Sequence, residues 1–66
     1  MKVISGRDLV RILRSGGWVV DRIKGSHHAM SCKDGKVVIP VHGNKDLQVG
    51  LQARLMKDTG LTEADL

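Results

Sequence analysis

The stretch Lys24–Val41 constrains the fold more than any other part of the chain, because it has the pattern of a β-hairpin. An Asp34-Gly35 pair lies between two runs of strand-forming residues. Asp-Gly tolerates the positive φ angles that a two-residue type I′ turn requires. We therefore predict two antiparallel strands, with Lys33 and Lys36 on either side of the turn.

This turn fixes which side chains face each other, because side chains alternate between the two sides of a strand. On the apolar side, which should face the core, the predicted pairs are Cys32 with Val37, Met30 with Ile39 and His28 with Val41. On the more polar side, the predicted pairs are His27 with His42, Ala29 with Pro40 and Ser31 with Val38. His28 is then at the rim of the core, and two other imidazoles lie close together on the outer side.

A helix is predicted before the hairpin, from about Gly6 to Ser15. Ser5 is a typical N-cap residue, and Asp8 is its expected capping-box partner. Apolar residues at positions i, i+3 and i+4 define the buried side of this helix: Leu9, Ile12 and Leu13. Gly16-Gly17 should end the helix, because one glycine can take the left-handed C′ position.

A strand should follow over residues 18–23. Trp18 and Val20 are expected on one side, and Val19, Asp21 and Ile23 on the other. The third strand ends at Pro40, which cannot donate to the ladder, so this strand is predicted at a sheet edge.

A second helix begins between Leu47 and Gly50 and ends near Thr59. Gly60 should cap it in a Schellman ending with Leu61 folding back, and Thr62 can start one further turn. The predicted fold is α+β, with the order α-β-β-β-α and both helices on one face of a three-stranded antiparallel sheet.

The net charge of +4 is unevenly distributed along the 66 residues. Residues 1–24 carry six basic and two acidic side chains, and 6 − 2 gives the whole excess of +4, whereas the charges cancel from Gly25 onward. Such an asymmetry is typical of a surface that meets a polyanion. Arg7, Arg11 and Arg14 form one basic stripe on the first helix, for which a solvated surface and RNA phosphate contact are equally good interpretations.

Composition excludes several other classes of protein. The single Cys, Cys32, permits no intrachain disulfide, and no run of residues resembles a signal peptide or a membrane span, so a soluble cytoplasmic protein is expected. Trp18 is the only aromatic residue apart from the histidines, so the stacking platforms of single-strand binders are missing and nucleic acid should be read through backbone and shape. A zinc site is disfavoured, because His27 and His28 point in opposite directions.

Several short motifs together resemble the HicA toxin family. They are Gly25-Ser26-His27-His28, the run of residues 39–44, and Lys57 with Gly60-Leu61. Members of this family are small bacterial ribonucleases with a fold similar to double-stranded-RNA-binding domains. The resemblance runs from Ser5 to Leu66, and implies a single HicA-like toxin domain over residues 1–66. Gly50-Leu51-Gln52 departs from the family pattern, which usually has Gly-Thr-Leu or similar.

The resemblance implies a function as well as a fold. His28 matches the family's catalytic histidine, which implies a general acid or base in a metal-independent endoribonuclease that cleaves mRNA without a cofactor. It implies a type II toxin–antitoxin system with a role in stress response, in which a HicB-type antitoxin covers the catalytic surface. The free toxin is expected to be a monomer in the bacterial cytoplasm, without a membrane partner.

Cleavage of RNA without a metal needs a group that removes the proton of a ribose 2′-hydroxyl and a group that protonates the leaving 5′-oxygen, and imidazole can do either. His27, His42 and Ser26 are candidate assistants of His28. The expected RNA-binding residues are Arg7, Arg11, Arg14, Arg22, Lys24 and Lys45. Strand alternation turns His28 inward, so its position at the rim, or a bulge at Gly25-Ser26, is needed to expose it.

Two functions of other classes are also compatible with the sequence. One is a non-catalytic RNA-binding module of the same shape, in which the histidines are incidental. The other is a small interaction protein whose charge only aids solubility.

Overall fold

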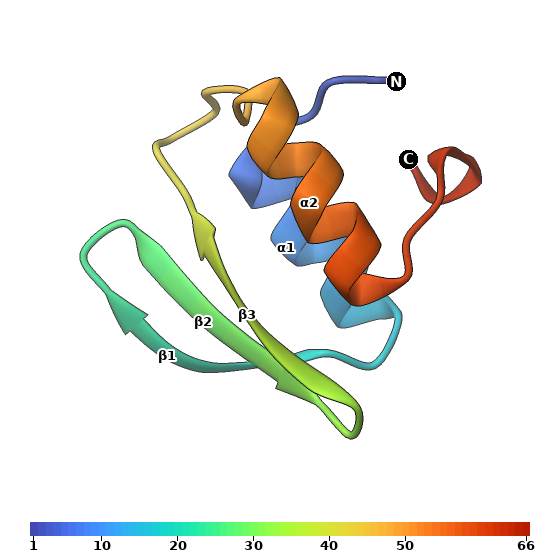
Figure 1. Cartoon of the computed structure of the whole chain (residues 1–66). Coiled ribbons are helices and arrows are strands. Elements are labelled where there is room, and N and C mark those ends of the chain that lie inside the picture. Colours follow the sequence, from blue (N-terminus) through green and yellow to red (C-terminus); the bar gives the residue numbers. More distant parts are fainter.

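The computed structural model describes all residues, 1–66. In chain order, its elements are α1 (Gly6–Ser15), β1 (Val19–Lys24), β2 (His27–Cys32), β3 (Gly35–Pro40), α2 (Val49–Thr59) and a short 3-10 helix, η1 (Glu63–Asp65). The strands form one antiparallel sheet in the order β1-β2-β3, and both helices lie on the same side of it (Figure 1). The predicted α-β-β-β-α fold is confirmed, with β3 at a sheet edge and the histidine strand in the middle.

Capping explains where α1 begins and ends. The Ser5 hydroxyl accepts a hydrogen bond from the backbone N–H of Asp8 at 3.1 Å, as predicted for an N-cap. The carboxylate of Asp8 pairs with Arg11 at 3.4 Å instead of closing a capping box, so that part of the prediction was wrong. At the other end Gly17 has a φ of 101°, and the N–H of Trp18 donates to the Leu13 carbonyl at 3.0 Å.

The end of α2 also follows the prediction. Gly60 has a φ of 77°, and the N–H of Leu61 donates to the Met56 carbonyl at 3.0 Å. This is the hydrogen bond of a Schellman motif, which left-handed glycine makes possible. Thr62 then begins η1, and its backbone N–H donates to the Asp65 carboxylate at 2.7 Å.

The turn between β2 and β3 differs from the prediction. Its central residues are Lys33 and Asp34, because Cys32 pairs with Gly35. No residue of this turn has a positive φ, so the predicted type I′ turn was wrong. The register is shifted by two residues, and every side chain keeps its predicted side because the period of a strand is two.

The same burial pattern fits both registers, which explains the error. Met30 now lies opposite Val37 rather than opposite Ile39, yet all three remain buried between the sheet and the helices. The backbone ladder distinguishes the registers, because it continues past the named strands with a hydrogen bond of 2.6 Å from the N–H of Val41 to the carbonyl of Ser26.

The shift in register separates His27 from His42. His27 pairs with Pro40, where β3 ends, and His42 lies two residues further on. The predicted pairing of the two imidazoles was therefore wrong.

A bulge in β1 changes which side chains face the helices. The pairing with β2 is regular up to Val20 and resumes at Arg22, so Asp21 is the extra residue. Beyond the bulge, Arg22 lies on the outer side and Ile23 on the helix side, opposite His28. The predicted grouping of Ile23 with Val19 and Asp21 was wrong. Gly25-Ser26, considered as an alternative site for a bulge, form a turn with Gly25 at a φ of 57°. Without the bulge, the charge of Arg22 would face the core side, where burial is costly.

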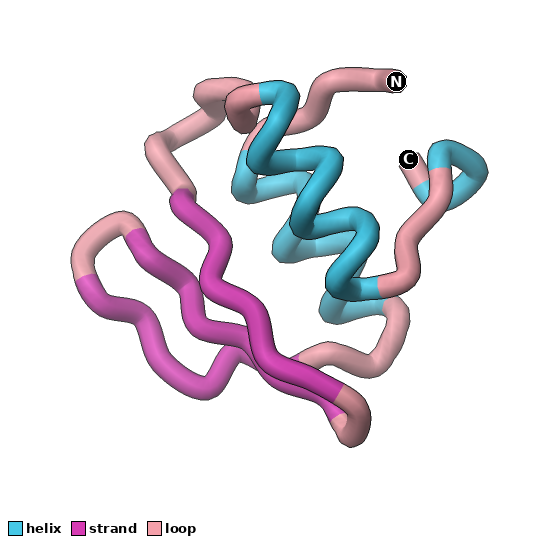
Figure 2. The backbone as a smooth tube through the Cα atoms, viewed as in Figure 1, coloured by secondary structure: helices cyan, strands magenta, loops and turns pink.

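The core is thin and lies between the sheet and the helices. Its buried hydrophobic cluster consists of Ile4, Leu9, Val10, Leu13, Met30, Val37, Ile39, Leu47 and Leu55. Short loops connect most elements, and the longest connection, residues 41–48, leads from β3 to α2 (Figure 2). Gly6 lies directly against the carbonyl oxygen of Pro40, so only glycine allows α1 to begin this close to the end of β3.

Gln52 is the one fully buried polar side chain of α2. Its Oε1 accepts from the Ile4 N–H at 3.0 Å, and its Nε2 donates to the Lys2 carbonyl at 2.6 Å. These hydrogen bonds join the first residues of the chain to α2.

Candidate active site

His28 is the second residue of the central strand and is half-buried on the helix side. It lies between Ile23 of β1 and Ile39 of β3 in the strand pairing. Its Nδ1 is the only buried side-chain nitrogen or oxygen in the protein without a hydrogen-bond partner. Catalytic and ligand-binding histidines usually have one nitrogen held by such a partner, which sets the tautomer. Nδ1 of His28 lacks such a partner, so no group of the protein fixes the tautomer of this ring.

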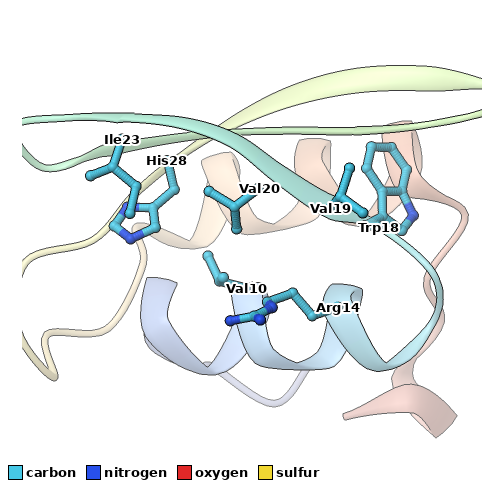
Figure 3. Close-up of a pocket in the computed structure, with 7 residues that line it drawn as sticks. All are labelled: Val10, Arg14, Trp18, Val19, Val20, Ile23 and His28. Atoms are coloured by element: carbon cyan, nitrogen blue, oxygen red, sulfur yellow. The ribbon is translucent and has the colours of Figure 1, made fainter.

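His28 lines an open hollow of about 540 Å³ between α1 and β1. Figure 3 shows His28 and Ile23 at one end of this hollow and Trp18 at the other, with Val20 above and Val10 and Arg14 below. Val19 completes the lining, and no carboxylate takes part. The ring is thus at the edge of the core and lines the same open hollow as Arg14, rather than being sealed among hydrocarbon side chains.

The hollow exists because β1 is an outer strand that the helices cover only in part. Both helices pack against β3, whereas only α1 also contacts β1 to an appreciable extent. The bulge at Asp21 then turns Ile23 toward this uncovered region, where 59% of its surface stays exposed. Apolar side chains of α1 and β1 therefore face each other across a gap that they do not fill.

The predicted basic stripe of α1 contributes mainly Arg14 to this site. Arg14 is exposed and forms no ion pair, whereas Arg11 is paired with Asp8. Arg7 is also exposed and unpaired, and it precedes Val10 by three residues, which places it on the same side of α1 as the hollow. Arg7 and Arg14 are thus the free cations of the stripe.

A second group of basic side chains lies on the other face of the sheet. Arg22, Lys24 and His27 line a smaller hollow of about 240 Å³ with Ala29 and Val38. Lys24 pairs directly with His27 across the two strands. His27 therefore lies on the opposite side of the sheet from His28, although the two are adjacent in the chain.

The remaining predicted residues fall into two further places. His42 and Lys45 lie in the connection before α2 and line a hollow of about 200 Å³ together with Gln48 and Leu51. Ser26 is half-buried in the turn between β1 and β2, two residues before His28, and shares its side of the strand. Of the three candidate assistants, His27 is on the opposite face of the sheet, and neither Ser26 nor His42 lines the hollow of His28.

Metal and thiol chemistry receive no support from the arrangement. His, Cys, Asp and Glu side chains do not gather in groups of three or more that could hold an ion. Cys32 was predicted to be buried and is half-buried, at the far end of β2 from His28. Neither helix has the length and apolar character that crossing a membrane would require.

Sequence reasoning missed the apolar residues of the hollow as part of the site. Val10 was not among the expected site residues, and Ile23 was predicted on the wrong side of its strand. A charged pair, Asp21-Arg22, in the middle of an otherwise apolar strand was the available signal for a bulge.

The fold and the site together define a small α+β domain in which a histidine of the central strand lies beside a basic helix. The sequence profile of the family described as HicA toxin of bacterial toxin-antitoxin matches residues 6–61. The chain belongs to this family, as the sequence motifs predicted. It is therefore the toxin of a toxin–antitoxin system, and such a toxin has an antitoxin as its partner. Curated proteins gave no match to the chain.

Proposed function

We propose that this toxin is a metal-independent endoribonuclease that cleaves mRNA, with His28 as its catalytic residue. The observation that supports this best is the position of His28 in an open hollow with the unpaired Arg14 and without any carboxylate. Imidazole titrates near neutral pH, and a nearby cation stabilises the charge that develops on a phosphate during cleavage.

The reaction transfers a phosphoryl group within the RNA. The 2′-oxygen loses its proton and forms a bond to the adjacent phosphorus, while the bond from phosphorus to the 5′-oxygen breaks and that oxygen takes up a proton. The products are a 2′,3′-cyclic phosphate and a 5′-hydroxyl end. His28 acts as general acid or base in this exchange, and Ser26, two residues before it in the chain, is a candidate assistant.

Basic side chains hold the remaining phosphates of the RNA. Arg14 binds at the hollow that His28 lines, with Arg7 about two turns earlier on the same side of α1, while Arg22 and Lys24 bind on the outer face of the sheet. Arg11 and Lys45 add charge at the edges of these surfaces. We further propose that the antitoxin is of the HicB type, that it covers the hollow, and that the free toxin is a monomer of one domain.

A cleavage assay in EDTA tests the catalytic role. Wild type should cut a single-stranded RNA to a 2′,3′-cyclic phosphate, and His28→Ala should reduce the rate by about 10²–10⁴-fold, the usual contribution of a general acid or base. His27→Ala should lower the cleavage rate much less, because His27 lies on the other side of the sheet. Equal cleavage by His28→Ala and wild type would show that another group is catalytic.

The rival function is a non-catalytic RNA-binding module. It draws support from the basic side chains on the outer face, which lie away from His28. A pure binder predicts no cleavage by any of these proteins, together with RNA binding that His28→Ala leaves unchanged.

A further inference from the structure

We propose that the hollow between α1 and β1 holds one unstacked nucleobase of the RNA, from a nucleotide next to the bond that is cut. This inference rests on the proposed ribonuclease function. It adds that the toxin reads a base of its single-stranded substrate as well as the backbone, which the scarcity of aromatic residues had argued against.

The walls of the hollow suit the flat face of a base. Val10, Val20 and Ile23 supply aliphatic surface from two elements, and Trp18 closes the end opposite His28 (Figure 3). Its volume of about 540 Å³ lies within the range of about 300–1,000 Å³ that is typical of small-molecule sites, so a base with its ribose fits.

The polar groups at the hollow suit the other parts of a nucleotide. Arg14 is unpaired and the lining contains no carboxylate, which favours a phosphate beside the base. His28 lines the hollow at the end opposite Trp18, and the proposal places the ribose at this end. In this arrangement the apolar wall contacts the base, the imidazole of His28 contacts the ribose, and the guanidinium of Arg14 contacts the phosphate.

The same geometry excludes duplex RNA. A base in a double helix is stacked and paired, so it can enter the hollow only after leaving its stack, which costs free energy. We therefore expect a single-stranded oligonucleotide to be cut at least about tenfold faster than the same sequence in a duplex.

Filling the hollow is the first test. Val20→Phe places a ring where the base should lie and should lower kcat/KM on single-stranded RNA at least about tenfold, the scale on which apolar pockets discriminate. Val49→Phe is the matched control, because Val49 is exposed on α2 and lines no hollow. Circular dichroism of both variants verifies that the fold is kept. Cleavage by Val20→Phe at the rate of the control would overturn the proposal.

Removing the base is the second test, and it uses the wild-type protein only. An abasic nucleotide is introduced on either side of the cleaved bond, one at a time, and at one of the two positions cleavage should fall at least about tenfold. If wild type cuts both abasic RNAs as fast as unmodified RNA, the hollow holds no base, and the ribonuclease function still stands. If wild type cuts no RNA at all, both proposals fail. If Val20→Phe cuts RNA normally but is no longer neutralised by the antitoxin, the hollow binds the antitoxin rather than a base.

Discussion

His27 and His28 are neighbours in the chain but meet different surroundings, because successive side chains of a strand point to opposite sides. His28 faces the hollow with Arg14, and His27 faces the outer side with Arg22 and Lys24. Two identical side chains thereby acquire different neighbours through alternation alone. This is why the cleavage test compares the two alanine variants directly.

Gln52 lies in Gly50-Leu51-Gln52, the stretch at which the chain was expected to depart from the HicA motif pattern. The structure gives a reason, since its amide holds the Ile4 N–H and the Lys2 carbonyl inside the protein. An apolar residue at position 52 could not form hydrogen bonds with these two backbone groups.

Replacement of Gln52 by Leu should therefore destabilise the fold. A buried backbone group left without a partner costs about 1–3 kcal/mol, so we expect the free energy of unfolding to fall by about 2 kcal/mol, as measured by urea denaturation. Gln48→Ala is the control, because Gln48 is exposed and caps α2 through one bond of 3.3 Å, and it should cost about 1 kcal/mol or less. A Gln52→Leu protein as stable as wild type would mean that the N-terminal residues rearrange freely.

At the scale of elements, the bulge in β1 shapes the site more than any single side chain does. One extra residue, Asp21, puts Arg22 outside and Ile23 inside, so the edge strand contributes charge to one face and apolar surface to the other. The bulge also makes the pairing of β1 irregular, which protects an outer strand from pairing with other chains.

Replacing the glycines near the two ends of α2 by alanine should change the free energy of unfolding in opposite directions. Gly60→Ala should lower the free energy of unfolding by about 1 kcal/mol, because Gly60 has a φ of 77° that alanine adopts poorly. Gly50→Ala should raise it by about 0.5 kcal/mol, since position 50 is helical and a Cβ there would meet Gln48 at an ordinary 3.6 Å. Thermal melts of both variants measure the difference. If both variants changed the melting temperature in the same direction, this account of the helix ends would be contradicted.

At the scale of the whole molecule, the excess positive charge is spread over several surfaces rather than gathered in one. Only Arg11 of the basic residues in the first third forms an ion pair with a carboxylate. Arg14 lies by the hollow, Arg22 and Lys24 lie on the outer face, and Lys45 lies before α2. An RNA strand that contacts all of them must wrap around the edge formed by β1.

The salt dependence of RNA binding tests this arrangement, with His28→Ala as the background so that the RNA stays intact. Each phosphate contact to a single strand contributes about 0.7 to the slope of log affinity against log salt. Removing Arg14 or Lys24 should each lower the slope by about this amount. Arg54→Ala should leave it unchanged, because Arg54 pairs with Asp58 on the far helix. An unchanged slope in the Lys24 variant would exclude the outer face from the RNA-binding surface.

The order of elements and the helix ends could be predicted from the sequence because they depend on local chemistry. Ser5, Gly17 and Gly60 act through hydrogen bonds and φ angles within a few residues of themselves. Which side chains of β2 face the core could be predicted for the same reason, since alternation is a property of the strand itself. His28 was identified as a site residue by its motif, and its catalytic role remains a prediction.

The register of the hairpin, the bulge at Asp21 and the hollow were decided by tertiary structure alone. Two registers that differ by two residues bury the same side chains, so only the full backbone ladder selects between them. The hollow depends on how far α1 reaches over β1, which is set by the packing of both helices against the sheet and not by the short connection between α1 and β1. Local patterns in the sequence specify which residues face the core, whereas the space left between packed elements exists only once the chain has folded.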